Sequence, residues 1–273
     1  EGLVNLATVN AHAGGAGLAV DEKLVTFLQE AKDLYGQTDG KMNVMLGSVL
    51  KLWHDCRDAA EKDPEDAAIP SPSALQAAAA HTDIDDLEID AANSTVRIAD
   101  PEALLDVGAV AKGYAVQRAA EALKSAGVSG YVLNIGGNIR SIGTKPDGSS
   151  WTVAITDPFS PESLMGSVTV TGQAVVTSGN YEKYFEENGK RYHHILDPCT
   201  GAPSESDVVS TTIIADKGID CDALSTATFL MGADAGMQLI DSLDGIEAVF
   251  IQSDGSVVTS KHIDKYQLQV NNS

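Results

Sequence analysis

The sequence predicts an α+β fold of mixed, largely antiparallel sheets with packed helices. Helical and strand-like segments are interspersed along the chain without the regular strand–helix–strand rhythm that is typical of a parallel sheet. With 273 residues, of which 43% are apolar, the chain can bury one large core or two closely packed subdomains. Since no linker is long enough to force separate domains, we expect one domain over residues 1–273, made of two closely packed subdomains.

The N-terminal region predicts mainly helices. Apolar residues recur at helical spacing over 21–35, and Gly36 is the expected C-cap. Residues 57–73 are rich in Asp, Glu, Ala and Pro, and we interpret them as a solvated surface loop. A short helix is expected near 73–80, and the alternation of apolar residues over 82–98 predicts a hairpin that turns at 91–93.

The rest of the chain predicts helices among many strands. A tight turn and a long Ala-rich helix, closed by Gly127, are expected over 106–125. Strands are expected at 131–135, 151–156, 168–171, 175–177, 192–196 and 208–214. Helices are then expected at about 222–230 and 235–243, and strands at 248–252 and 257–259 complete the domain.

Charge and cysteine content exclude several classes of protein. The 39 acidic and 18 basic residues give a formal net charge of −21, so we expect no binding to nucleic acid or to anionic lipid, and any phosphate must be held by local groups. The three cysteines form no CxxC pair and are expected to be small core residues. No apolar run approaches the roughly 20 residues of a membrane span, and no basic-then-apolar leader is recognised.

The first candidate site is the segment Asp106–Tyr114, where a loop turns into a helix. Gly108 lets the backbone approach a ligand, and the free N–H groups of a first helical turn can bind an anion. Lys112 lies in that turn, where the helix dipole disfavours a cation, so a negative ligand nearby would explain its position. Alternatively, Asp106 is an N-cap and Lys112 a solvated side chain. The segment is neither a Walker A loop nor a GxGxxG turn.

Asp222 and Thr226 form the second candidate site. They stand four residues apart at a helix start, so their oxygens emerge from one helix face, one turn apart. A carboxylate, a hydroxyl and a main-chain carbonyl are hard ligands of the kind that Mg²⁺ prefers, and an ion with so few protein ligands usually shares substrate phosphate. Helix capping is the alternative explanation.

A histidine pair and two glycine-containing segments complete the candidates. His193 and His194 are adjacent in a predicted strand, so at most one readily faces a given cleft, and a histidine at a strand end can act as a general base. A structural role is the alternative. Gly136 and Gly137, and Gly179 in the segment 177–181, allow a ligand close to the backbone, although simple turns explain them equally well.

Five collinear segments together resemble the ApbE family of flavin transferases, also called FAD:protein FMN transferases. The pattern Asp-hydrophobic-Gly-x-hydrophobic-Ala-Lys-Gly-Tyr-Ala is matched over 106–115, and Asn-x-Gly-Gly-Asp/Asn-hydrophobic-Arg over 134–140. Thr-Ser-Gly-Asp-Tyr-x-x-Tyr-Phe is matched over 177–185, with Asn180 in place of Asp. The patterns His-Ile-hydrophobic-Asp-Pro-x-Thr-Gly-x-Pro and Asp-Ala-Leu-Ser-Thr-Ala are matched over 194–203 and 222–227. Upstream, a stretch that usually reads Gly-x-Phe-Asp has Met42 and Asn43 in place of the aromatic and the acid.

The resemblance implies an enzyme that uses Mg²⁺ to move FMN from FAD to a threonine or serine hydroxyl of an acceptor protein, releasing AMP. It implies Mg²⁺ on the Asp222 carboxylate, the Thr226 hydroxyl and the Ala109 carbonyl. His194, with Asp197 nearby, is the candidate to take the proton from the acceptor hydroxyl. The residues expected to contact FAD are Met42, His81, Thr82, Asp83, Asp106, Lys112, Gly136, Gly137, Thr177, Ser178, Gly179, His194 and Ile195.

The resemblance also implies a setting. Family members usually work outside the cytoplasm, often lipid-anchored, so we expect a periplasmic or cell-surface location and an acceptor that is a subunit of a membrane redox complex. The chain is expected to lack the family's first N-terminal elements. Two alternatives stay open. One is an FAD pyrophosphatase with water as the acceptor, and the other is a flavin-binding or carrier protein that does not turn FAD over. Residues 222–228 faintly resemble the motif on which such transferases act, so Thr228 is a further candidate for modification.

Overall fold

The computed structural model describes residues 4–63, 65 and 68–271, and it confirms the α+β fold. Every pairing between named strands in this part of the chain is antiparallel. The chain divides into two compact units. The first holds the described residues up to Gly108 together with 182–204, and the second holds 109–181 and the described residues from 205 onward. The expectation of a single domain stays a prediction.

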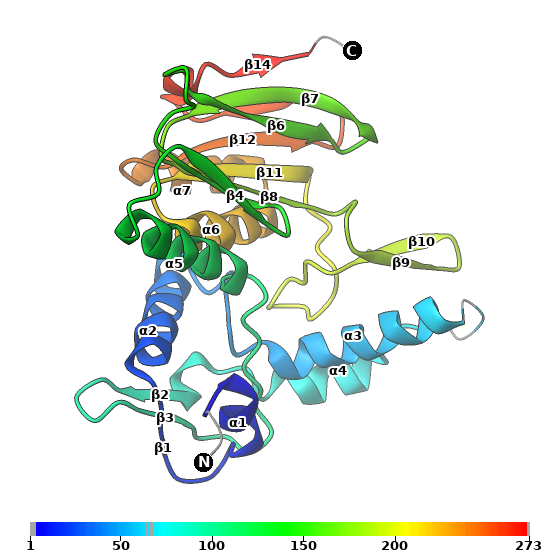
Figure 1. Ribbon diagram of the computed structural model, residues 1–273. Helices are drawn as coiled ribbons and strands as arrows, with labels where there is room; N and C mark the ends of the chain where they lie inside the picture. The colour runs from blue at the N-terminus through cyan, green and yellow to red at the C-terminus, as the bar shows by residue number, and fades with distance from the viewer. Residues whose placement is uncertain (1–3, 64, 66–67, 272–273) are drawn as a thin grey trace. The chain divides into compact units, whose positions relative to one another are not determined.

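The first unit combines helices with two small sheets (Figure 1). Its helices are α1 (Leu6–Ala11), α2 (Glu22–Gln37), α3 (Gly47–Lys62), α4 (Pro72–Ala79) and the 3-10 turn η2 (Ile84–Asp86). Its strands are β1 (Leu18–Ala19), β2 (Leu87–Asp90), β3 (Thr95–Ile98), β9 (Tyr184–Glu187) and β10 (Lys190–His193). They form a sheet of order β1-β3-β2 and the hairpin β10-β9, so the hairpin predicted over 82–98 is confirmed as β2–β3.

Helix α2 confirms the helix predicted over 21–35 but not its C-cap. Asp21 caps the N-terminus, where its carboxylate accepts a hydrogen bond from the Lys23 N–H at 2.8 Å. The helix continues through Gly36 because Thr38 closes it. The hydroxyl and the N–H of Thr38 both donate to the Leu34 carbonyl, at 2.8 and 3.0 Å.

The surface loop expected at 57–73 is wrong over its first third, where α3 runs on to Lys62. Val49 and Trp53 give this helix a buried face, so packing overrides its loop-like composition. Helix α4 confirms the short helix predicted near 73–80, with Ser71 as its N-cap. Residues 64, 66 and 67 of the expected loop lie outside the described residues.

Aromatic packing joins α3 to the β9–β10 hairpin within the first unit. Tyr192 stacks on both Trp53 and Phe185, with ring centroids 5.7 and 5.5 Å away. The indole Nε1 of Trp53 donates to the buried Gly201 carbonyl at 2.7 Å. These contacts tie three separate stretches of the chain together.

The second unit is layered, with helices on one face of a six-stranded sheet and a smaller sheet on the other (Figure 1). The larger sheet has the order β13-β12-β11-β8-β5-β4 and the smaller one β14-β7-β6. The helices are α5 (Ala111–Ser125), α6 (Gly218–Met231), α7 (Ala233–Ser242) and the 3-10 turn η3 (Ile263–Tyr266). The strands are β4 (Tyr131–Ile135), β5 (Asn138–Ile142), β6 (Trp151–Asp157), β7 (Ser160–Val170), β8 (Ala174–Gly179), β11 (Val208–Ala215), β12 (Glu247–Gln252), β13 (Val257–Thr259) and β14 (Gln269–Val270).

An apolar core fills the space between the two sheets of the second unit. Val153 and Val168 of the β6–β7 hairpin pack with Val175, Ile214 and Val249 of the larger sheet. The opposite face of that sheet is covered by α6, which contacts β8 and β11 and buries most of its residues. A charged side chain on the buried part of α6 therefore lies inside the protein, where it needs an ion-pair or hydrogen-bond partner.

Most elements predicted for this unit are confirmed, with shifted ends. The strands predicted at 131–135 and 257–259 coincide with β4 and β13, and α5, α6 and α7 confirm the three helices. Strand β7 starts eight residues before the predicted 168–171, and in the first unit the strand predicted at 192–196 ends at His193. The sequence does not predict β5, because Asn138, Arg140 and Ser141 make it polar, and its pairing with β4 and β8 decides its conformation.

The cysteines are only partly core residues. Cys221 is buried as expected, Cys56 is half-buried, and Cys199 is exposed, so the core prediction is wrong for Cys199. All three are free thiols. Among the described residues, no helix combines the length and the apolar character that crossing a bilayer requires.

Candidate functional site

The second unit's candidate site lies where α5 and α6 touch main chain to main chain. A Cβ atom on Gly113 of α5 would collide with the carbonyl of Gly218 of α6, and one on Gly218 would collide with the carbonyl of Gly113. Only glycine at both positions permits this approach. The contact brings the first turn of α5 against the start of α6, beside Asp222 in the second turn of α6.

Asp222 is buried, at 2% exposure, and both of its carboxylate oxygens are engaged. Lys112 Nζ lies 3.0 Å from Oδ1, and the Gly113 N–H donates to Oδ2 at 2.9 Å. The Gly113 N–H is one of the donors in the first turn of α5 that have no partner within the helix. Lys112 is therefore not a merely solvated side chain. Its negative partner is Asp222, and this ion pair explains why a cation lies beside a helix N-terminus.

Thr226 follows Asp222 by one turn of α6, as predicted, and belongs to a chain of hydroxyl groups. Its Oγ1 donates to the Asp222 carbonyl at 3.4 Å and lies 3.4 Å from Ser178 Oγ. Ser178 Oγ also lies 2.8 Å from Ser225 Oγ. Ser178, which was expected to contact FAD, therefore also orients the Thr226 hydroxyl from strand β8.

The carbonyl of Ala109 lies outside the hydrogen-bond ladder of α5. Val110 is the N-cap, and the first main-chain bond of the helix runs from the Tyr114 N–H to the Val110 carbonyl at 3.0 Å. Asp222 contacts Gly113, which is one turn beyond Ala109. A carboxylate, a hydroxyl and a carbonyl are all hard oxygen donors, so these residues fit Mg²⁺. The described residues contain no group of three or more His, Cys, Asp or Glu side chains that could hold a metal.

Gly136 and Gly137 form the two-residue turn between β4 and β5, with φ of +56° and +87°. Positive φ at both positions is the geometry of a tight hairpin turn, and it explains the two glycines. Asn134 supports the turn by accepting from the Gly137 N–H at 3.0 Å. Gly136 lies beside the stem of Lys112, since a Cβ there would come within 3.5 Å of the lysine Cδ.

Thr177 and Gly179 flank Ser178 on β8 and have structural partners. Thr177 Oγ1 lies 2.8 Å from Thr212 Oγ1 on the neighbouring strand β11. Gly179 leaves room for the ring of Tyr181, which a Cβ would strike. Both observations fit a tightly packed strand end, and contact with FAD stays a prediction for these residues.

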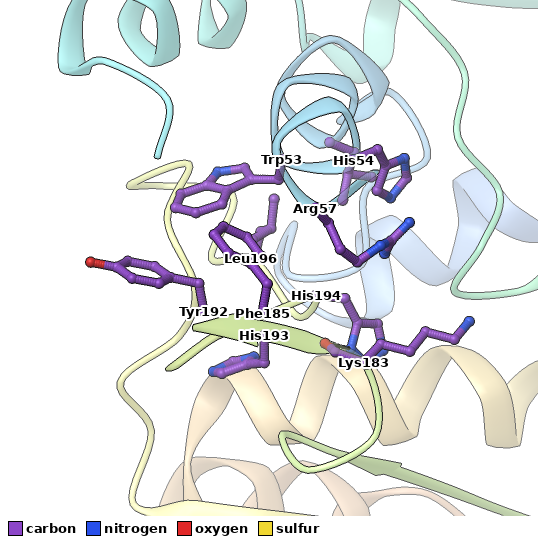
Figure 2. A pocket seen from close by; sticks show the side chains of 10 residues that line it. Trp53, His54, Arg57, Lys183, Phe185, Tyr192, His193, His194 and Leu196 are labelled. Atoms are coloured by element: carbon purple, nitrogen blue, oxygen red, sulfur yellow. Dashed lines mark hydrogen bonds between the residues drawn. The ribbon is translucent and has the colours of Figure 1, made fainter. Parts of the chain in front are cut away.

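His194 lines a small pocket of the first unit (Figure 2). In this view His54, Arg57, Lys183 and His194 occupy one side, and Trp53 and the other aromatic residues form the opposite wall. Sequence reasoning did not single out His54, Arg57 or Lys183, because a basic residue on a helix or hairpin carries no signal of a pocket until the fold brings several together.

The pocket makes His194 a neutral imidazole. Burial lowers the pKa of His194 to about 4, and the nearby Lys183 and Arg57 charges act in the same direction. The ring Nδ1 lies 3.2 Å from the Lys183 carbonyl, so the proton is assigned to Nδ1. That tautomer leaves Nε2 as an acceptor, which is the state a general base needs.

His193 has a different role from its neighbour. Its Nε2 lies 3.0 Å from the Ser204 carbonyl, and its Nδ1 accepts from the Ile195 N–H at 3.3 Å. Both ring nitrogens are thus used by the main chain, and burial lowers the pKa of His193 as well. Of the two histidines, His194 is the one with a nitrogen available for chemistry.

Asp197 does not pair with the His194 ring, contrary to the expectation that the two act together. Its carboxylate lies 3.3 Å from Lys41 Nζ and accepts from the Cys199 N–H at 2.9 Å. The turn after Ile195 directs the side chain there, because the Thr200 and Gly201 N–H groups close on the Asp197 carbonyl. The group that orients His194 is the Lys183 carbonyl.

Three further predicted FAD contacts have structural partners in the first unit. Met42 and Ile195 are buried, at 1% and 3% exposure, so their side chains are not presented to a ligand in this structure. Asp106 is not an N-cap of α5, since its Oδ1 accepts from the Gly108 N–H at 2.8 Å and shapes the loop before the helix.

His81, Thr82 and Asp83 lie together between α4 and β2. His81 Nδ1 lies 2.6 Å from Asp100 Oδ2, and this hydrogen bond raises the pKa of His81. Thr82 donates its hydroxyl to the Ala79 carbonyl at 3.0 Å, while Asp83 caps η2. Contact of these three residues with FAD stays a prediction.

Thr228 is not presented for modification in this structure. Its side chain is wholly buried, and its hydroxyl donates to the Leu224 carbonyl at 2.7 Å within α6. The idea that this chain carries its own flavin at Thr228 is therefore wrong for the folded state, because no other protein can reach that oxygen.

Three comparisons with known proteins point to one group. The profile of the ApbE family matches residues 4–250. The chain is 35% identical to the FAD:protein FMN transferase of Treponema pallidum (strain Nichols) over 272 residues, which cover 94% of this chain and 73% of the relative. Its structure is similar to that of the ApbE protein from Thermotoga maritima, with a TM-score of 0.85 and 30% identity over 96% of this chain and 82% of that one. It is also similar to the flavin transferase ApbE from Vibrio cholerae, with a TM-score of 0.79 and 29% identity over the same shares of the two chains. The chain therefore belongs to the ApbE family.

Proposed function

We propose that this chain transfers FMN from FAD to a threonine or serine hydroxyl of an acceptor protein, with release of AMP. The observation that carries the proposal is the oxygen cluster at the contact of α5 and α6. There a buried Asp222 carboxylate and the Thr226 hydroxyl share one helix face, and Lys112 contacts the carboxylate. Such a cluster suits a nucleotide diphosphate better than any neutral substrate.

Mg²⁺ is the metal we propose for Asp222, Thr226 and the Ala109 carbonyl. Bound there, it would offset the charge of the FAD pyrophosphate and stabilise the charge that develops on the leaving AMP. A local cation is needed because the protein's net charge of −21 repels a diphosphate. Lys112 supplies a second positive group, and the Gly136–Gly137 turn allows close approach of the main chain.

His194 is the proposed general base. With its proton on Nδ1 and held by the Lys183 carbonyl, its Nε2 takes the proton of the acceptor hydroxyl. The hydroxyl oxygen then forms a bond to the phosphorus on the FMN side of FAD. The bond from that phosphorus to the bridging oxygen breaks, and the oxygen leaves with AMP.

Mass spectrometry of a candidate acceptor, incubated with FAD, Mg²⁺ and this chain, tests the proposal. We expect one FMN, joined by a phosphoester, for each AMP released. Free FMN and AMP with an unmodified acceptor would identify a pyrophosphatase that uses water. Intact FAD that merely co-purifies with the chain would identify a binding protein.

A subunit of a membrane redox complex is the acceptor that we propose, and the proposed location is extracytoplasmic, at a membrane surface. Both proposals rest on the resemblance to the family. In-gel flavin fluorescence of fractionated cells, with and without the protein, tests them together. The expected result is a covalently fluorescent membrane protein that is lost when the protein is absent, and a fluorescent band confined to the cytoplasm would contradict it.

A further inference from the structure

We propose that Lys112 is an internal counter-ion for the metal-binding carboxylate. It holds Asp222 Oδ1 until a divalent cation replaces it, and it is then free for the phosphate of the nucleotide. This inference deepens the proposed function and rests on it, because it requires that Asp222 bind a divalent cation.

The first argument is the burial of Asp222. At 2% exposure its carboxylate has lost nearly all contact with water, and a buried charge without a partner is strongly destabilising. Lys112 Nζ at 3.0 Å from Oδ1 supplies the opposite charge. A site that must later accept a cation is therefore kept folded by a cation that belongs to the chain.

The second argument identifies Oδ1 as the exchangeable oxygen. The Gly113 N–H donates to Oδ2, and Gly113 cannot retreat because it packs directly on the main chain of Gly218. Lys112, in contrast, reaches Oδ1 through a flexible four-carbon stem, and its side chain is 39% exposed. One partner of the carboxylate is rigid and the other can leave.

The third argument is electrostatic. A divalent cation on Oδ1 would place two positive groups on one oxygen, and like charges a few ångström apart repel strongly where water is excluded. The ion and Lys112 therefore compete for Asp222. One neighbour of the lysine stem is Gly136, which has no side chain to confine a displaced Lys112.

Competition of this kind couples the metal to the nucleotide. A metal that displaces Lys112 makes its ammonium available to phosphate, and a phosphate that draws Lys112 away uncovers Asp222 for the metal. By linkage, each ligand raises the affinity of the chain for the other by the same factor.

Binding of Mn²⁺ to metal-stripped protein, followed by the electron paramagnetic resonance of free Mn²⁺ in the absence of FAD, tests the inference without any activity measurement. Lys112→Met is expected to bind Mn²⁺ about tenfold more tightly than the wild-type chain, because the competing charge is gone. Added FAD is expected to tighten Mn²⁺ binding in the wild type but much less in this variant. Lys124→Met, which removes an exposed lysine from the last turn of the same helix, is the matched control and should leave the affinity unchanged.

Lys112→Gln serves if the methionine variant fails to fold, since glutamine can still hydrogen-bond Asp222 without a charge, and it should also bind Mn²⁺ more tightly. Asp222→Asn separates the counter-ion inference for Lys112 from the assignment of Asp222 as a metal ligand. If it abolishes Mn²⁺ binding while the uncharged Lys112 variants bind no more tightly than wild type, the counter-ion inference is overturned and the metal assignment stands. If Mn²⁺ binds neither to Lys112→Met nor to the wild type with FAD, or if Asp222→Asn binds it as tightly as the wild type, both are overturned.

Discussion

The two candidate clusters respond to burial in opposite ways. In the second unit, the buried Asp222 carboxylate is balanced by the Lys112 ammonium and the Gly113 N–H. In the first unit, His194 lies beside Lys183 and Arg57, which are cations like its own protonated form, so burial and its neighbours together remove its proton. Burying a charge costs free energy in both clusters. An ion pair offsets that cost for Asp222, and loss of the proton avoids it for His194.

This difference teaches which chemistry each cluster can perform. A carboxylate that keeps an opposite charge is suited to exchange one cation for another. A histidine that stays neutral keeps Nε2 free of a proton at physiological pH, which general-base catalysis requires. The five predictions below test the contrast, beginning with the largest expected effect.

Loss of the Asp222 carboxylate, the proposed metal ligand, should have the largest effect. Asp222→Asn is expected to lower FMN transfer about a thousandfold, because a Lewis-acid metal contributes several kcal/mol and each 1.36 kcal/mol is a factor of ten. The rate is measured by mass spectrometry of the acceptor at saturating FAD. Asp220→Asn, two residues earlier on α6, is the control. Equal rates for the two variants would remove Asp222 from the mechanism.

His194→Gln should follow, with transfer lowered about a hundredfold, the lower range for loss of a general base. Metal affinity is expected to stay near wild type, because this side chain acts on the acceptor hydroxyl and the proposed metal ligands are Asp222, Thr226 and Ala109. His12→Gln, at the exposed C-cap of α1, is the control. A variant that keeps its turnover number but binds the acceptor poorly would show that His194 only positions the acceptor.

Gly113→Ala should separate α5 from α6. The added methyl group meets the Gly218 carbonyl and Asp222, so we expect a loss of about 1–3 kcal/mol in the free energy of unfolding, together with weaker metal binding. Gly36→Ala adds the same methyl group within α2, where it has open space, and should stabilise by up to about 1 kcal/mol. Urea denaturation of both variants measures the contrast, and equal midpoints would refute the tight contact.

Trp53→Phe should destabilise the wall of the His194 pocket. It leaves the buried Gly201 carbonyl without its donor, which costs about 1–3 kcal/mol. Trp151→Phe removes an exposed indole bond to the Gly143 carbonyl, at 3.0 Å, and should cost less than about 1 kcal/mol. Metal affinity should be unchanged in both, and a shift in Trp53→Phe would mean that the two clusters are coupled.

The pH profile carries the smallest expected change. With a pKa of about 4, His194 stays neutral as the pH falls from 7.5 to 6. Protonation of His194 should therefore barely lower kcat/KM for the acceptor over that range. An ordinary histidine with a pKa near 6.5 would be about three quarters protonated at pH 6, and the rate would fall accordingly. A half-maximal rate near pH 6.5 that moves with substitution of His194 would show that the ring is less buried during turnover.

Much of the fold follows from local sequence. The repeat of apolar residues at helical spacing predicts α2, and alternation predicts the β2–β3 hairpin, because these segments each bury one face. Helix α3 shows where this reasoning ends. Its second half is rich in Asp, Ala and Glu, which we interpret as a loop, but Cys56 and Ala60 there pack with Val49 and Trp53 against the core of the first unit, and the segment is helical.

The candidate site divides in the same way. Sequence by itself determined that Asp222 and Thr226 share a helix face, and it offered a simple turn as one explanation of Gly136 and Gly137, since both depend on backbone geometry within a few residues. It could not determine that Lys112, 110 positions away, pairs with Asp222, or that a carbonyl rather than Asp197 orients His194. Tertiary packing brings together partners so distant in the chain. Burial then decides which charged groups need an ion pair and which lose their charge through a shifted pKa.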